Sequence, residues 1–204
     1  MSAHHRLLLA LHLEQIDLLD EQIARLSAEI AARLRPDEAD LQRLETIPGV
    51  GRRTAEVLAA EMGLEMARFA NASHLASWAG MCPGVHESAG KRKPAKRRHG
   101  NAAIQRALTE AAHAAARTKK PDRTYLRGQH RRLMVRGGKK KAAVAVGHTI
   151  LRIAYHLLTH ETTYQEKELT YLDERRRARA QQRALDQLKA LGYDVTLTPN
   201  APAA

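Results

Sequence analysis

Between Leu7 and Leu34, apolar side chains recur every three or four residues, and charged side chains occupy the other faces. This period predicts a long helix with one apolar seam, of the kind that pairs in coiled coils. Pro36 ends the helix, because proline lacks the amide that a helix interior needs. The seam consists of Leu9, Leu13, Ile16, Leu19, Ile23, Leu26, Ile30 and Leu34.

We therefore assign residues 1–36 to a coiled-coil helix that mediates dimerisation. A helix this long with one apolar side needs a partner, because its seam would otherwise stay in water. Pairing with a second chain, as a homo-oligomer, is the interpretation we favour. The alternative is a helix that folds back on its own domain.

The next pattern joins two short helices through a glycine-rich turn. In residues 41–62, helical stretches flank the string Ile47-Pro48-Gly49-Val50-Gly51, where glycine permits the positive φ that a tight turn needs. The string resembles the helix-hairpin-helix motif, which grips DNA without reading its sequence. Free amides and the dipole of the second helix would then bind a backbone phosphate. The DNA-binding candidates are Gly49, Gly51, Arg52 and Arg53, and an ordinary glycine-capped turn is the alternative.

The remaining patterns are also those of helices, so the predicted fold class is mainly α. The predicted segments are 73–80, with Trp78 as a core anchor rather than a base-stacking residue, 101–117 with Asn101 as its cap, 142–160, and 174–189. The alanine-rich segment 101–117 favours close helix packing. We place residues 41–160 in one compact domain and residues 161–204 in a charged helical tail with a disordered end.

Charge is the strongest bulk signal. The formal net charge is +12, and the cations cluster in Lys91 to Arg98 and in Arg117 to Lys141. Clustered Lys and Arg favour a polyanionic partner, because they release condensed counterions when they bind. Cys82 is the only cysteine, which fits a reducing cytoplasm and offers no zinc site. No stretch approaches the length of an apolar membrane span, so we expect no membrane partner.

One hydroxyl lies at the start of the first cationic cluster. Ser88 follows His86 and Glu87, either of which could orient the hydroxyl or accept its proton, and serine needs such help to become a nucleophile. The cations beside it would bind phosphates: Lys91, Arg92, Lys93, Lys96, Arg97 and Arg98. On chemistry alone, a serine that only hydrogen-bonds its own loop is the commoner case.

The order of motifs resembles one family. The strings are Ile-Pro-Gly-Val-Gly at 47–51, Trp-Ala-Gly-Met-Cys-Pro at 78–83, Glu-Ser-Ala-Gly-Lys-Arg at 87–92, Gly-Asn at 100–101, Gly-Gly-Lys-Lys-Lys-Ala at 137–142, Ile-Ala-Tyr-His-Leu-Leu at 153–158 and Leu-Gly-Tyr-Asp-Val-Thr-Leu at 191–197. Together they resemble the carboxy-terminal half of the DEDD/serine insertion-sequence transposases. These are also called bridge recombinases and are related to the Piv/MooV DNA invertases.

The resemblance implies a DNA transposition and recombination function. The family's serine nucleophile falls at Ser88 in the basic catalytic loop at 80–101, with Glu87 and His86 as candidate helpers. The resemblance further implies DNA and a guide RNA as partners. Lys139, Lys140 and Lys141 are a candidate second contact with the DNA backbone, and a surface lysine cluster with no specific role is the alternative. It also implies a bacterial, cytoplasmic and nucleoid-associated protein. Magnesium belongs to the family's amino-terminal RuvC-like domain, so we expect no metal or other cofactor in this chain.

The chain departs from the family pattern at several positions. No RuvC-like strands or acidic quartet precede the first helix, which suggests a truncated reading frame, a decayed element or a separately translated fragment. Arg97 stands where Thr or Ser is commoner, His99 where Gln or Arg is commoner, and Gln105 where Arg is usual. Two hypotheses remain: a recombinase half that uses Ser88, or a catalytically silent fragment that binds DNA and assembles with intact transposase.

Overall fold

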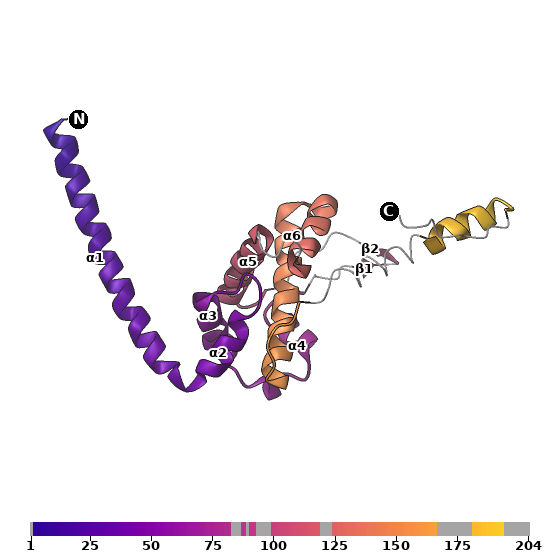
Figure 1. Ribbon diagram of the computed structural model, residues 1–204, viewed down its shortest axis with the longest axis horizontal. Coiled ribbons are helices and arrows are strands. Elements are labelled where there is room, and N and C mark those ends of the chain that lie inside the picture. Colours follow the sequence, from indigo (N-terminus) through magenta and orange to yellow (C-terminus); the bar gives the residue numbers. More distant parts are fainter. Residues whose placement is uncertain are drawn as a thin grey trace, which may run out of the picture.

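The computed structural model describes residues 2–82, 87–88, 90–92, 99–118, 124–166 and 181–193. At Glu87, Ser88 and Arg92 it describes the backbone alone. The architecture is mainly α, as predicted: helices pack around one core, and the only strands in the described ranges form a two-residue ladder (Figure 1).

The first helix, α1 (Ala3–Arg33), extends away from the other helices (Figure 1). Ser2 caps it, and the short 3₁₀ turn η1 (Arg35–Asp37) contains Pro36 and ends it where the sequence predicts. No residue of α1 is buried, and the seam residues from Leu9 to Leu26 are about half exposed. The helix therefore does not fold back on its own domain, and that alternative is wrong.

Two short helices follow, α2 (Glu38–Glu45) and α3 (Arg52–Met62), on either side of the predicted glycine-rich turn. Leu41, Leu44 and Leu58 are fully buried and anchor the pair in the core. The turn itself is also packed inward, because Ile47 and Val50 are at most 5% exposed. The pattern of helix, turn and helix is therefore present, and its role in DNA binding stays a prediction.

After the 3₁₀ turn η2 (Met66–Arg68), helix α4 (Ala72–Trp78) begins at Asn71, whose side chain accepts a hydrogen bond from the His74 amide. Gly80, with φ +69°, ends it in a Schellman motif: the Gly80 amide donates to the Ser77 carbonyl and the Met81 amide to the Ala76 carbonyl. Met81 is buried against Gly147. The prediction that Trp78 is a core anchor is wrong, because its side chain is 43% exposed.

The two largest elements are α5 (Ala102–Arg117) and α6 (Tyr125–His160), which pack against each other. Asn101 caps α5 as predicted, accepting from the Ile104 amide at 3.0 Å. Small residues allow the backbones of α5 and α6 to approach closely: a side-chain carbon added at Gly147 would lie 3.1 Å from the Leu108 carbonyl oxygen. The alanine-rich pattern thus packs as the sequence predicts.

Helix α6 is a hairpin of two arms, because Gly138 (φ +80°, ψ 167°) interrupts it. The side chain of Gln129 in the first arm donates to Thr149 Oγ1 in the second at 2.9 Å, so the arms run side by side in opposite directions (Figure 1). The sequence predicted only the second arm. Of its apolar residues, Val146, Ile150 and Leu151 are fully buried, and Ile153 is partly buried.

By length and composition, α6 could cross a membrane, which contradicts the expectation that no stretch approaches such a span. Half of the most apolar 18-residue stretch of α6 is buried within the protein, and the hairpin bends at Gly138. The apolar composition is thus explained by packing against α4 and α5.

Residues 161–166, which we assigned to the tail, belong to the packed domain. The Tyr164 amide donates to Thr46 Oγ1 at 2.9 Å, and the Glu166 carboxylate accepts from the Tyr125 amide at the start of α6. Burial raises the pKa of the Tyr164 hydroxyl, and the nearby Glu166 carboxylate adds to that effect. Further on, the predicted charged helix is described over 181–190, and residues 174–180 and 194–204 lie outside the described residues.

Candidate nucleic-acid interface

The two ends of the basic loop at 80–101 meet at a tightly packed base. A side-chain carbon added at Gly100 would lie 2.4 Å from the Gly80 nitrogen and 2.5 Å from the Ala79 carbonyl. Gln105, which is buried in α5, donates from Nε2 to the same Ala79 carbonyl oxygen at 2.9 Å. These contacts fix the base of the loop.

A second tie holds the carboxy-terminal end of the loop. Asn101 caps α5 with its side-chain oxygen and donates from Nδ2 to Glu61 on α3 at 2.6 Å. One side chain thus joins the loop, the start of α5 and the end of α3. Gln105, at a position where the resemblance predicts Arg, has a structural role here. Its side-chain amide donates a hydrogen bond to the buried backbone carbonyl of Ala79.

At the far end of the loop, strands β1 (Glu87–Ser88) and β2 (Lys91–Arg92) form an antiparallel ladder. Ser88 is the register partner of Lys91, whose side chain is exposed, and Glu87 is the partner of Arg92. Gly90 has φ +73° in the turn between them. The predicted nucleophile is therefore at the turn of a short hairpin. His86, Lys93, Lys96, Arg97 and Arg98 lie outside the described residues.

The prediction that Arg52 and Arg53 bind phosphate receives no support from their contacts. Both terminal nitrogens of Arg52 donate to Glu38, at 2.7 and 2.8 Å, and its Nε donates to Glu56 at 3.2 Å. Arg53 donates to the other Glu56 oxygen and to Ser27 on α1, both at 2.9 Å. Two arginines thus join α1, α2 and α3.

The charge balance of this cluster is unfavourable for a second anion. Glu45 also approaches Arg52, at 3.6 Å, so three carboxylates surround two guanidinium groups. The hydrogen bond from Arg52 lowers the pKa of the Glu38 carboxyl, and the same pairing raises the pKa of Arg52. The cations are therefore neutralised within the protein, and a phosphate would have to displace a carboxylate.

The two glycines of the turn have opposite environments. Gly49, with φ +89°, lies against α5, and a side-chain carbon there would be 2.3 Å from the Ala111 carbonyl oxygen. Gly51 is exposed, with nothing within 4 Å of such a carbon. Gly49 therefore packs helices together, and only Gly51 remains accessible to a partner.

The tip of α6 carries the densest exposed positive charge among the described residues. We define it as residues 135–141, all of them exposed. Lys139, Lys140 and Lys141 follow the bend at Gly138, and Arg136 precedes it. The whole of α6 contains eight Lys and Arg residues and no Asp or Glu. The three predicted lysines thus lie at the end of a helical hairpin that is free of negative charge.

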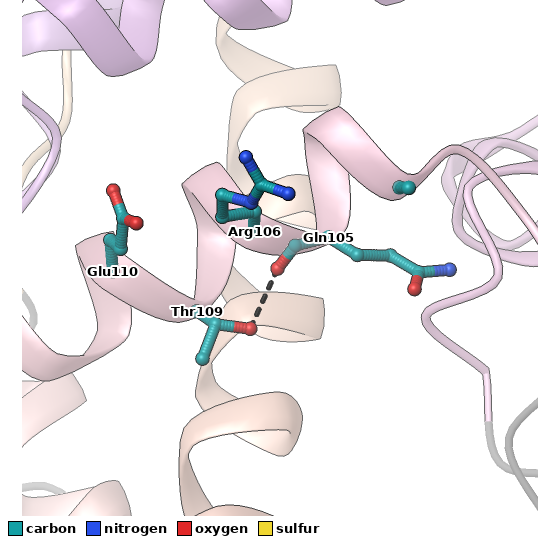
Figure 2. Close-up of a pocket in the computed structure, with 5 residues that line it drawn as sticks. Gln105, Arg106, Thr109 and Glu110 are labelled. Atoms are coloured by element: carbon teal, nitrogen blue, oxygen red, sulfur yellow. Dashed lines mark hydrogen bonds between the residues drawn. The ribbon is translucent and has the colours of Figure 1, made fainter.

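An open hollow of about 320 Å³ lies along α5. Ala102, Gln105, Arg106, Thr109 and Glu110 line it, and Figure 2 shows the hydrogen bond from Thr109 to the Gln105 carbonyl. All five residues come from a single helix, so the hollow does not enclose a small molecule as substrate pockets do. Within the described ranges, no three His, Cys, Asp or Glu residues could hold a metal ion together.

Comparison with known proteins relates this chain to one family. Residues 41–127 match the model of the transposase IS116/IS110/IS902 family. That segment of the chain belongs to the family. The matched segment contains α2 to α5 and the basic loop, whereas α1 and the tip of α6 lie outside it.

Two curated relatives extend the family match along the chain. The transposase for insertion sequence element IS1111A of Coxiella burnetii is 31% identical over 149 residues, 72% of this chain and 40% of the relative. The 43.6 kDa protein of insertion element IS110 of Streptomyces coelicolor is 31% identical over 153 residues, 72% of this chain and 35% of the relative. The chain thus spans well under half the length of these transposase-family relatives.

Two features of this family member were missed by sequence reasoning. The first arm of α6 lacked a clear apolar period, and the paired glycines at 137–138 could have indicated the bend. Nothing in the sequence indicated that Trp78 would be exposed, because the exposure of one residue at a helix end depends on how the helix packs against the rest of the chain.

Proposed function

We propose that this chain is the DNA-binding and strand-transferring part of an insertion-sequence transposase. Family membership and its transposase relatives support the reaction class. The observation that carries DNA binding is the exposed, acid-free positive charge of the α6 tip, together with Lys91 beside Ser88 in the basic loop. A polyanion binds such surfaces because counterions are released from its phosphates.

In the proposed reaction, the Ser88 hydroxyl attacks a DNA phosphorus. A bond forms between Oγ and phosphorus, the bond to one deoxyribose oxygen breaks, and that oxygen leaves as an alcohol by taking up the proton that the serine hydroxyl has given up. The hydroxyl proton passes to a base, for which Glu87 and His86 are the candidates in the sequence. Lys91 and the cations at 92–98 would stabilise the charge on the phosphate. Magnesium and a guide RNA stay predictions of the family resemblance.

The role of the α6 tip is tested by the salt dependence of DNA binding. Replacing Lys139 and Lys140 with Gln should lower the slope of log affinity against log salt by about 1.8, since each lost phosphate contact removes about 0.9. Fluorescence anisotropy of a labelled duplex measures the slope. The matched control replaces Arg183 and Lys189, exposed cations on the helix at 181–190, with Gln. Equal slopes for the two double variants would show that the α6 tip is not part of the DNA interface.

We further propose that α1 pairs with α1 of a second chain. A helix of 31 residues with no buried residue gains little stability by itself, since most helical stability in proteins comes from packing of an apolar face. Its length of about 46 Å offers a long seam for such packing.

Self-association through the seam can be tested with two glutamate variants. Ile16→Glu, within the seam, should shift the chain to monomer, because it places a charge in the apolar contact. Leu11→Glu, on the opposite face and similarly exposed at 52%, should leave association unchanged. Sedimentation equilibrium measures both. If Ile16→Glu self-associates as strongly as the parent chain, the seam does not mediate pairing.

A further inference from the structure

The chain's single tryptophan presents a large aromatic surface to solvent. Trp78 is 43% exposed, although Leu75 and Ala76 on α4 and Ala79 directly after it are fully buried. The indole therefore lies at the edge of the core, and one side of it is available to a ligand.

The other side of the indole is supported by the protein. The Phe69 ring lies 5.5 Å from it, centroid to centroid, at an angle of 56°. Phe69 is itself held in place, since it is only 9% exposed and its carbonyl accepts a hydrogen bond from the Tyr155 hydroxyl at 3.2 Å. The Schellman motif at Gly80 fixes the backbone directly after Trp78. The exposed indole is thus a preorganised surface rather than a mobile side chain.

Trp78 also lies at the base of the loop that carries Ser88. It is followed by Ala79 and Gly80, the residues against which Gly100 packs, so it stands beside both ends of the loop. The surrounding segment is free of negative charge: no Asp or Glu occurs between Met66 and His86, whereas Arg68 and His74 are both exposed. A negatively charged strand can therefore approach the indole without repulsion from this segment.

We propose that Trp78 stacks on an unpaired DNA base next to the phosphodiester that the basic loop holds. This inference rests on the proposed function. Exchanging strands between two duplexes requires the bases beside the break to leave their stack, and an aromatic face replaces part of the lost stacking. Such stacking accepts any base, because every base has a π face. The chain would then hold the phosphate by charge and the adjacent base by its aromatic surface.

The single tryptophan reports on its own contact, since stacking on a base quenches indole emission. A single-stranded oligonucleotide, or a duplex with a mismatched bubble, should quench the emission of the full chain strongly. The same sequence fully paired should bind with little quenching. An RNA strand of that sequence is the third ligand, and stronger quenching by RNA than by DNA would overturn the assignment to a DNA base.

Variants separate stacking from a structural role. Trp78→Ala should weaken binding of the bubble duplex about tenfold and leave binding of the paired duplex unchanged, whereas Trp78→Phe should keep most of the affinity. Thermal unfolding monitored by circular dichroism shows whether each variant is folded, and the Phe variant keeps the test valid if the Ala variant is not. Tyr193→Ala, at an aromatic residue 63% exposed outside this region, should change neither affinity.

Each contrary result has a distinct meaning. If anisotropy shows the bubble duplex bound while Trp78 emission stays constant, DNA binding stands and stacking is rejected. If emission changes when the protein is concentrated without DNA, a second copy covers the indole and the inference is wrong. If no DNA of any form binds, the proposed function fails and this inference fails with it.

Discussion

Gly49→Ala should destabilise the fold by about 2–5 kcal/mol, the largest stability effect that we expect from a single methyl group. The new carbon would lie 2.3 Å from the Ala111 carbonyl oxygen and 2.6 Å from the Ala115 nitrogen, both in the backbone of α5. Overpacking costs about 1–3 kcal/mol, and a non-glycine residue at φ +89° adds about 1–2 kcal/mol of strain. The turn and α5 cannot move apart without opening the core between them.

Gly51→Ala is the matched control, two residues along the same turn. Its added carbon meets nothing within 4 Å and its φ is −102°, so we expect a change within about 1 kcal/mol, the size of an N-cap effect. Urea unfolding followed by circular dichroism gives both free energies. Equal stabilities of the two variants would show that Gly49 does not pack against α5 in solution. The turn would then be available for DNA in the way that the sequence motif suggests.

The elements that the sequence predicted well are those with strong local signals. The seam and Pro36 predicted α1 within a few residues, and Asn101 with its alanine-rich helix predicted α5 and its cap. These signals come from residues close to one another in the chain, and the structure follows them because tertiary packing does not oppose them.

The contacts of Arg52 were beyond prediction, because they depend on distant residues. Its main partner, Glu38, lies fourteen positions earlier, and Ser27, the partner of Arg53, lies on another helix. In a sequence with net charge +12, two arginines beside a glycine-rich turn resemble a phosphate site. Only the fold reveals that carboxylates already occupy them. The DNA interface we propose therefore moves from the turn to the basic loop and the α6 tip.

The candidate phosphate contacts whose side chains the structure describes, Lys91 and the lysines of the α6 tip, lie at or beside turns. The glycines at 137–138 bend α6, and Gly90 turns the β-hairpin that bears Ser88. Charges at the end of a hairpin project beyond the packed domain. They can therefore reach a duplex while the core residues behind them stay packed. The packed base at Gly100 and Gln105 would keep the reacting loop in place while phosphate is bound.

Ser88→Ala should abolish any covalent protein–DNA adduct, because alanine has no oxygen to bond to phosphorus. The assay mixes the chain with a full-length relative and a nicked DNA substrate, then separates protein under denaturing conditions and locates the modified peptide by mass spectrometry. The adduct should map to residue 88. Ser73→Ala, at an exposed serine of α4, is the control and should keep the adduct.

The binding measurements decide how a negative result is read. Ser88→Ala should bind DNA with the parent affinity and salt slope, since a hydroxyl contributes no charge to counterion release. An adduct that persists in Ser88→Ala would remove this serine from the mechanism. If the parent chain binds DNA but forms no adduct in mixed assemblies, the silent-fragment hypothesis is the better one, because the charge of the loop and the α6 tip would then serve binding alone.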